Sequence, residues 1–118
     1  MSPQARTRKK KTVRLERARV HVHSTFNNTI LTLTDLDGNT LAWQSGGTAG
    51  FTGSRKGTPY AAQLACQALI RQMKDMGIRA VIVTVDGAGP GRQPVIQTLR
   101  AAGIQVEEVK NITPTPHS

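Results

Sequence analysis

Two glycine-rich segments of the sequence carry cationic side chains, a combination that suits the binding of phosphate groups. The first segment, GGTAGFTGSRKG at 46–57, contains five glycines. The second, DGAGPGR at 86–92, leads into a predicted helix. Exposed backbone amides, the free N–H groups of a helix start and cationic side chains all attract phosphate oxygens. We therefore predict phosphate contacts from Arg55, Lys56, Gly91 and Arg92.

The spacing of these glycines does not match the common nucleotide-binding loops. Gly87, Gly89 and Gly91 follow a G-x-G-x-G pattern rather than the G-x-G-x-x-G of dinucleotide folds, and 46–57 contains no G-x-x-x-x-G-K-[ST]. Two plainer interpretations stay open. The segment 86–92 also suits a tight turn with a purely structural role, and 46–57 also suits a mobile surface loop with incidental charge.

Positive charge is concentrated at the start of the chain. The 118 residues include 16 Lys and Arg against 7 Asp and Glu, a net charge of +9. Eight of these cations lie between residues 6 and 19, opposed there only by Glu16, whereas the rest of the chain has eight cations and six acids. A nearly neutral body with a cationic arm is typical of a polyanion binder. Nucleic-acid contacts are predicted from Arg8, Lys9, Lys10 and Lys11, with a solvated, disordered arm as the alternative.

The few aromatic side chains indicate how a nucleic acid would be bound. Besides histidine, the rings are Phe26, Trp43, Phe51 and Tyr60. Four scattered rings are too few to form a platform on which successive single-stranded bases stack. Contacts from cations and backbone amides to a folded RNA fit the composition better.

The remaining candidate residues carry no catalytic or metal-binding signature. His21 and His23 share one face of a predicted strand, but no nearby third ligand is evident. Cys66, the only cysteine, excludes an internal disulfide and is predicted to lie in the core. Asn27 and Asn28 either stabilise a turn or contact RNA sugars and bases. We predict no catalytic residue, no metal and no cofactor.

Local patterns predict five strands. Alternation or β-branched content predicts strands at 18–24, 29–34, 40–45 and 80–85, and a last strand beginning at 104. Asp37-Gly38 indicates a hairpin between the second and third of them. The run AVIVTV at 80–85 is typical of a strand buried on both faces.

Two helices are predicted between these strands. Thr58 as N-cap, Pro59 in the first turn and Gly77 after the last turn define a helix over 59–76. Its apolar residues recur at helical spacing and form one stripe, made of Ala62, Cys66, Leu69, Met73 and Met76. A second helix is predicted over 92–102, ended by Gly103.

The element order β-β-β-α-β-α-β predicts an α/β fold with a mixed five-stranded sheet and packed helices. The first three strands suggest an antiparallel meander, and the last two, joined by a crossover helix, should be parallel. We divide the chain into a disordered basic arm (1–17), a globular domain (18–112) and an extended end (113–118). The order resembles the ribonuclease-H-like fold, whose members include metal-dependent nucleases. Asp35, Asp37, Asp75 and Asp86 are too scattered for a two-metal site, so no enzyme is predicted.

Several blocks of the sequence closely resemble one protein family. These blocks are STFNNTI (24–30), GTAGFTGSRKGTPYAAQLA (47–65), GAGPGR (87–92) and TPTPH (113–117). Together they resemble the bacterial-type small-subunit ribosomal protein eleven family, from about residue 21 to 117, in the same order and spacing. By these motifs the resemblance implies rRNA contacts at Asn27, Asn28, Arg55, Lys56, Gly91, Arg92 and His117.

The resemblance also implies a place in the cell and a set of partners. It implies a structural component of the small-subunit platform that bridges rRNA helices and forms part of the Shine–Dalgarno and mRNA exit region. Neighbours would be small-subunit ribosomal proteins seven and eighteen, with mRNA nearby and no membrane or small-molecule substrate. The ribosome would be that of the bacterial cytoplasm or, alternatively, of an organelle. Family members usually continue after Pro-His with Asn-Gly-Cys-Arg-Pro and a basic tail, where this sequence has Ser118, so no contact is carried over from that tail.

Overall fold

The computed structural model describes residues 16–112, so the predicted contacts of Arg8, Lys9, Lys10, Lys11 and His117 lie outside the described residues. The element order β-β-β-α-β-α-β is confirmed, with one short helix in addition. The elements are β1 (Arg17–Ser24), β2 (Thr29–Thr34), β3 (Thr40–Ser45), η1 (Gly53–Gly57), α1 (Pro59–Asp75), β4 (Ala80–Asp86), α2 (Arg92–Ala101) and β5 (Gln105–Asn111). Neither α1 nor α2 is long and apolar enough to cross a membrane.

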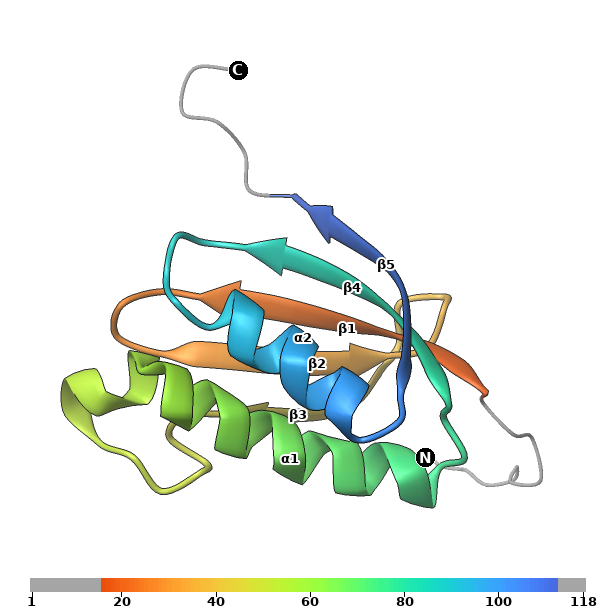
Figure 1. The fold of residues 1–118 in the computed structure, drawn as a ribbon, viewed down its shortest axis with the longest axis horizontal. Coiled ribbons are helices and arrows are strands. Elements are labelled where there is room, and N and C mark those ends of the chain that lie inside the picture. Colours follow the sequence, from red (N-terminus) through yellow and green to blue (C-terminus); the bar gives the residue numbers. More distant parts are fainter. Residues whose placement is uncertain (1–15, 113–118) are drawn as a thin grey trace.

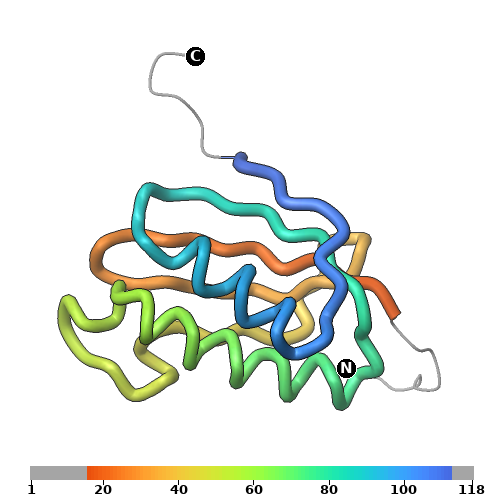
Figure 2. Tube along the Cα trace, viewed as in Figure 1, coloured from red at the N-terminus to blue at the C-terminus, as the bar shows by residue number. Residues whose placement is uncertain are grey.

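The five strands form one mixed sheet in the order β3-β2-β1-β4-β5. β1 and β2 pair antiparallel, as do β2 and β3, which confirms the predicted meander. β4 is parallel to β1 and to β5, as expected for strands joined by crossover helices. Figure 1 shows α1 and α2 side by side on one face of the sheet, both running in the same direction. The trace in Figure 2 shows that both helices start at the end where β1 and β4 finish.

The element bounds differ from the predicted ones in one respect that matters. No local pattern in residues 46–57 indicates a helix, but Gly53–Gly57 forms the 3-10 helix η1. The amide of Arg55 donates to the carbonyl of Thr52 at 3.2 Å, and the amide of Thr58 donates to that of Arg55, also at 3.2 Å. One turn of 3-10 helix is too short to leave a periodic apolar pattern in the sequence.

The core lies between the sheet and the two helices. Val20, Val22, Leu31 and Leu33 of the two central strands are fully buried on the helix side. The predicted stripe of α1 packs on them, and Cys66 at its centre is fully buried. Burial raises the pKa of the Cys66 thiol to about 12, so this thiol is a protonated core group at neutral pH.

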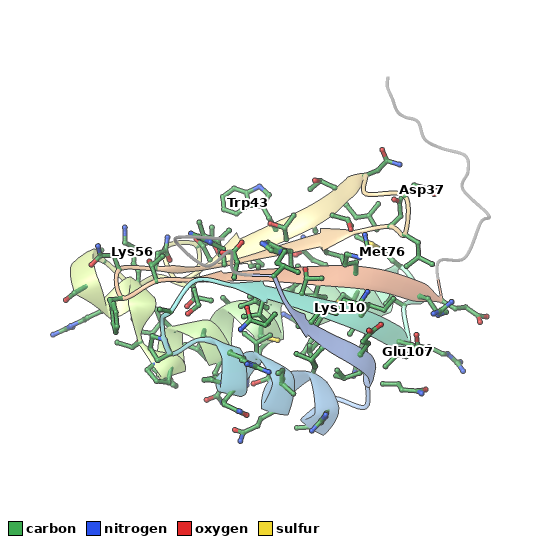
Figure 3. All side chains as sticks on the ribbon, turned by 90° about the horizontal axis from the view of Figure 1, so that it is seen from above. Asp37, Trp43, Lys56, Met76, Glu107 and Lys110 are labelled. Carbon is green, nitrogen blue, oxygen red and sulfur yellow. The ribbon has the colours of Figure 1, made fainter. Side chains whose placement is uncertain are left out.

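No helix within residues 16–112 covers the opposite face of the sheet. Strand pairing places Trp43, Thr32, His21, Thr84 and Lys110 in one row across this face. Figure 3 shows Trp43 pointing away from the helices, and its side chain is 56% exposed. This face therefore carries polar and charged side chains, whereas the other face is apolar and packs against the helices.

Candidate nucleic-acid interface

The predicted site residues gather at one end of the sheet. We call this end, made of residues 25–28, 46–58 and 87–92, the loop end. It holds the β1–β2 turn, the long segment between β3 and α1, and the turn from β4 into α2 (Figure 1). Because β1 and β4 are parallel and each leads into a loop there, segments distant in sequence meet. Both helices also begin at this end, so the positive ends of their dipoles lie there.

The three segments of the loop end are locked together by close backbone contacts. A Cβ added at Gly57 would overlap the backbone carbonyl of Phe26, and one added at Gly46 would overlap the carbonyl of Lys56. The amide of Gly46 also donates to the carbonyl of Thr29 at 3.1 Å. These positions need glycine because backbone atoms of another segment occupy the space that a side chain would fill.

The turn from β4 into α2 is bound to the end of β1. The amide of Gly89 donates to the carbonyl of Ser24 at 2.9 Å, and the amide of Gly91 donates to the hydroxyl of Ser24 at 2.8 Å. Gly91 is buried, and a Cβ there would lie 2.5 Å from Oγ1 of Thr29. Both amides already donate within the protein, so the structure gives no support to the prediction that the Gly91 amide faces a phosphate. The structure favours the alternative, a tight structural turn.

The two asparagines of the β1–β2 turn have different surroundings. Oδ1 of Asn28 accepts a hydrogen bond from the amide of Gly46 at 3.2 Å, so this side chain ties the turn to the next loop. Thr25 closes the turn itself, its hydroxyl oxygen accepting from the amides of Asn27 and Asn28. Asn27 is exposed. Of the two, Asn27 is the better placed to contact a ligand.

Three cationic side chains are presented by the loop end. Arg55 lies in η1 and is exposed, and Arg92 is the exposed first residue of α2. Lys56 is partly buried, and Figure 3 shows it at the extremity of the molecule where the loops gather. Among the salt bridges within residues 16–112, none involves these three side chains. Their charge is available to an external anion.

The carboxylate of Asp86, at the end of β4 just before the loop end, accepts hydrogen bonds from two histidines. Oδ2 of Asp86 accepts a hydrogen bond from Nε2 of His21 at 2.8 Å, and Oδ1 accepts one from Nδ1 of His23. Desolvation alone would raise the pKa of Asp86, but the hydrogen bonds from His23 and His21 outweigh it and hold this pKa below its usual range. The sequence placed the two histidines on one face, but it did not predict that Asp86 joins them. Only the tertiary structure reveals this contact, because the pairing of β1 with β4 places His23 beside Asp86.

Replacing Asp86 with asparagine is expected to lower stability mainly above pH 4. The depressed pKa means that Asp86 contributes stability above its unfolded pKa of about 3.9, and that this contribution is lost as pH falls through the lower folded value. We expect Asp86→Asn to cost roughly 1 kcal/mol near pH 6. Urea denaturation at pH 6, 4 and 3 should show the difference from the wild type shrinking with acid.

The matched control for this titration is Asp37→Asn. Asp37 is exposed in the β2–β3 hairpin, where Asn-Gly serves the turn as well as Asp-Gly. An Asp86→Asn penalty of equal size at pH 3 and pH 6 would show that ionisation of this carboxyl does not stabilise the fold.

An aromatic pair fixes the long loop to the first turn of α1. The rings of Phe51 and Tyr60 meet edge to face, with centroids 5.8 Å apart and planes at 87°. Tyr60 remains 59% exposed, so one side of its ring faces solvent. This contact was not predicted, because ring packing between a loop and a helix leaves no periodic pattern in the sequence.

The open face of the sheet differs from the loop end in its charge. Arg17 forms a salt bridge with Glu107 at 2.8 Å, and Lys110 lies 3.8 Å from Glu108. The hydrogen bond to Glu107 raises the pKa of Arg17. These two ion pairs compensate part of the charge on this side, whereas Arg55, Lys56 and Arg92 form no salt bridge among the described residues.

Comparison with known proteins gives one consistent result. The family model described as Ribosomal protein S11 matches residues 18–118. The chain is 56% identical over 110 residues to the small ribosomal subunit protein uS11 of Thermotoga maritima, covering 93% of this chain and 85% of that protein. It is 51% identical to the uS11 of Kosmotoga olearia, covering 97% and 88%, and 46% identical to that of Aquifex aeolicus, covering 97% and 91%. With matches of this extent, the chain belongs to the ribosomal protein S11 family.

Proposed function

We propose that this protein is a structural constituent of the small ribosomal subunit that binds small-subunit rRNA through its loop end. Its family consists of ribosomal proteins and not enzymes, and its relatives are small-subunit proteins. Among residues 16–112 no group of three or more His, Cys, Asp and Glu side chains is placed to hold a metal ion. The role is one of binding and positioning.

The observation that carries this proposal is the unpaired positive charge at the loop end. Arg55 and Lys56 lie in η1 and Arg92 lies at the start of α2, and these three residues form no salt bridge within the described chain. The N-termini of α1 and α2 add their partial positive charge at the same end. Several cations held on one rigid surface suit the closely spaced phosphates of a folded RNA.

The locked backbone explains how such contacts gain affinity. The glycine contacts and the bonds from Gly89 and Gly91 to Ser24 fix the loops before RNA arrives. A preformed surface loses less conformational entropy on binding than a mobile loop. In this proposal Gly91 positions Arg92 and does not itself contact phosphate, while Asn27, Arg55, Lys56 and Arg92 make the contacts. Asn28 holds the turn through Gly46.

The finer placement within the ribosome extends this proposal. We place the protein on the platform, bridging rRNA helices near the Shine–Dalgarno and mRNA exit region, with small-subunit proteins seven and eighteen as neighbours. Its basic arm, including Arg8 and Lys9–Lys11, would neutralise crowded phosphates, and His117 would add a contact beyond the folded domain. The bacterial relatives support a cytoplasmic ribosome of bacterial type.

Sedimentation of a cell lysate tests the central claim. A tagged full-length chain is expected to migrate with the small subunit at low salt and to bind purified small-subunit rRNA. Competition with large-subunit rRNA and with short single strands measures the specificity of that binding. A chain that stays at the top of the gradient and ignores small-subunit rRNA in dilute buffer would overturn the proposal. Equal affinity for short single strands would instead indicate a general single-strand binder.

A further inference from the structure

A groove lined by both polar and apolar side chains runs between the two helices, outside the loop end. Its floor and walls enclose about 450 Å³. It is lined at the loop end by Pro59, Tyr60 and Pro94, and further along by Gln63, Gln67 and Gln97. A second hollow, sharing Gln67 with the first, continues it towards the C-terminal ends of both helices. The groove thus follows the direction shared by α1 and α2 in Figure 1.

The lining of this groove is uncharged but rich in hydrogen-bonding groups. Gln63, Gln67 and Gln97 are exposed, and no hydrogen bond within residues 16–112 involves their side-chain amides. By contrast, the glutamine pair between α1 and β3 is satisfied internally, since Nε2 of Gln44 donates to Oε1 of Gln72 at 3.0 Å. Each free amide offers both donors and an acceptor. The groove therefore suits a ligand whose groups both donate and accept.

One arginine on each helix lies about a turn beyond a lining glutamine. Arg71 follows Gln67 by four residues on α1, and Arg100 follows Gln97 by three on α2, so both lie beside the lining residues. Arg71 and Arg100 are exposed and form no salt bridge among the described residues. The only carboxylate on the two helices is Asp75, in the last turn of α1. A neutral floor between positive rims complements a polyanion that exposes neutral groups between two charged backbones.

We infer that this groove binds the minor groove of a double-helical segment of rRNA, with the glutamine amides contacting ribose 2′-hydroxyls. The inference rests on the proposed function, since it assigns a second contact surface for the same rRNA. The minor groove of an RNA helix is wide and shallow and displays 2′-hydroxyls, which both donate and accept, between two rows of phosphates. The glutamine amides would form hydrogen bonds with the 2′-hydroxyls, and Arg71 and Arg100 would form ion pairs with the phosphates.

Continuity with the loop end supports RNA as the occupant. Tyr60 lines the groove and packs on Phe51 of the long loop, so the two surfaces join without a break. Arg92 stands at the start of α2, two residues before the lining residue Pro94. An RNA bound at the loop end would therefore extend a helix along α1 and α2 over uninterrupted positive and neutral surface.

The triple variant Gln63→Ala, Gln67→Ala, Gln97→Ala tests this inference in the full chain. Affinity for small-subunit rRNA is expected to fall about tenfold or more, because three hydrogen-bonding side chains are removed from the interface. The salt dependence should stay unchanged, because no charge is removed. Hydroxyl-radical footprinting should show that ribose protection disappears from two short stretches, one on each strand of the bound RNA helix. Alanine favours helix more than glutamine does, so folding is preserved, which circular dichroism verifies.

The matched control removes an exposed glutamine outside the groove, as Gln105→Ala in β5, which lines neither hollow. This control should keep wild-type affinity and footprint. If the groove variant also keeps both while the wild type binds rRNA, the inference is wrong and the proposed function stands. A groove variant that binds rRNA normally but no longer assembles with other small-subunit proteins would indicate a protein occupant and would equally overturn it. Failure of the wild type to bind rRNA would instead refute the proposed function.

Discussion

Replacing Gly57 with alanine is expected to destabilise the folded protein by about 3 kcal/mol, the upper end of the usual cost of overpacking. The added Cβ would overlap the backbone carbonyl of Phe26, and backbone atoms cannot rotate away as a flexible side chain can. The loop or the β1–β2 turn must move instead, which breaks the junction that holds the loop end together. Against a typical total of about 5–15 kcal/mol, this loss is large. Urea denaturation followed by far-UV circular dichroism measures it as a lower midpoint at constant slope.

Gly47→Ala in the same segment is the control. A Cβ at Gly47 would meet its nearest atoms, Oγ of Ser45 and Cδ of Lys56, at the ordinary distances of 3.5 and 3.6 Å. Its stability should stay within about 0.5 kcal/mol of the wild type. Equal stability of the Gly57 and Gly47 variants would show that the close approach of the loop and the β1–β2 turn is not required for folding.

Replacing Arg55 and Lys56 with alanine is expected to weaken binding to small-subunit rRNA by roughly 30-fold at low salt, at about 1 kcal/mol for each side chain. The slope of log affinity against log salt should become shallower by up to about 2, because a phosphate that the variant no longer neutralises keeps its counterions. Neither side chain forms a salt bridge within residues 16–112, so the fold should be preserved. Filter binding or fluorescence titration across a salt series gives both quantities.

Lys74→Ala with Arg79→Ala provides a charge-matched comparison. Both residues are exposed and lie together at the opposite end of the sheet, beside Glu16. Removing them lowers the net charge by the same amount, so any general effect of charge on attraction to RNA appears in both variants. An identical loss of affinity and slope in the two double variants would mean that the loop end has no special part in binding.

These two predictions separate the two properties on which the proposed binding depends. Gly57 sets the shape of the loop end through its backbone contact with Phe26. Arg55 and Lys56 provide the positive charge that binds phosphate. A Gly57 variant should lose stability first and rRNA affinity as a consequence. The Arg55 and Lys56 variant should lose rRNA affinity at unchanged stability.

Local sequence patterns determined the elements and most of their bounds. Alternation placed Val20 and Val22 in the core, and the stripe centred on Cys66 placed one face of α1 against the sheet. The β2 and β3 bounds were predicted residue for residue, because β-branched runs and an Asp-Gly turn act locally. That Arg55, Lys56 and Arg92 meet at one end was not predicted, but it is consistent with the predicted order of elements. Parallel strands joined by crossover helices bring their connecting loops to one end.

Only the tertiary structure decided what the glycines and the isolated acid do. Whether the Gly91 amide faces a ligand or Ser24 depends on a contact between residues 67 positions apart, which no local pattern encodes. The same holds for Asp86, whose histidine partners lie on β1 and become neighbours through strand register. The groove between α1 and α2 likewise exists only where two helices pack side by side on one sheet face. Local propensity specifies elements, but the distances between non-adjacent segments are set by packing of the whole core.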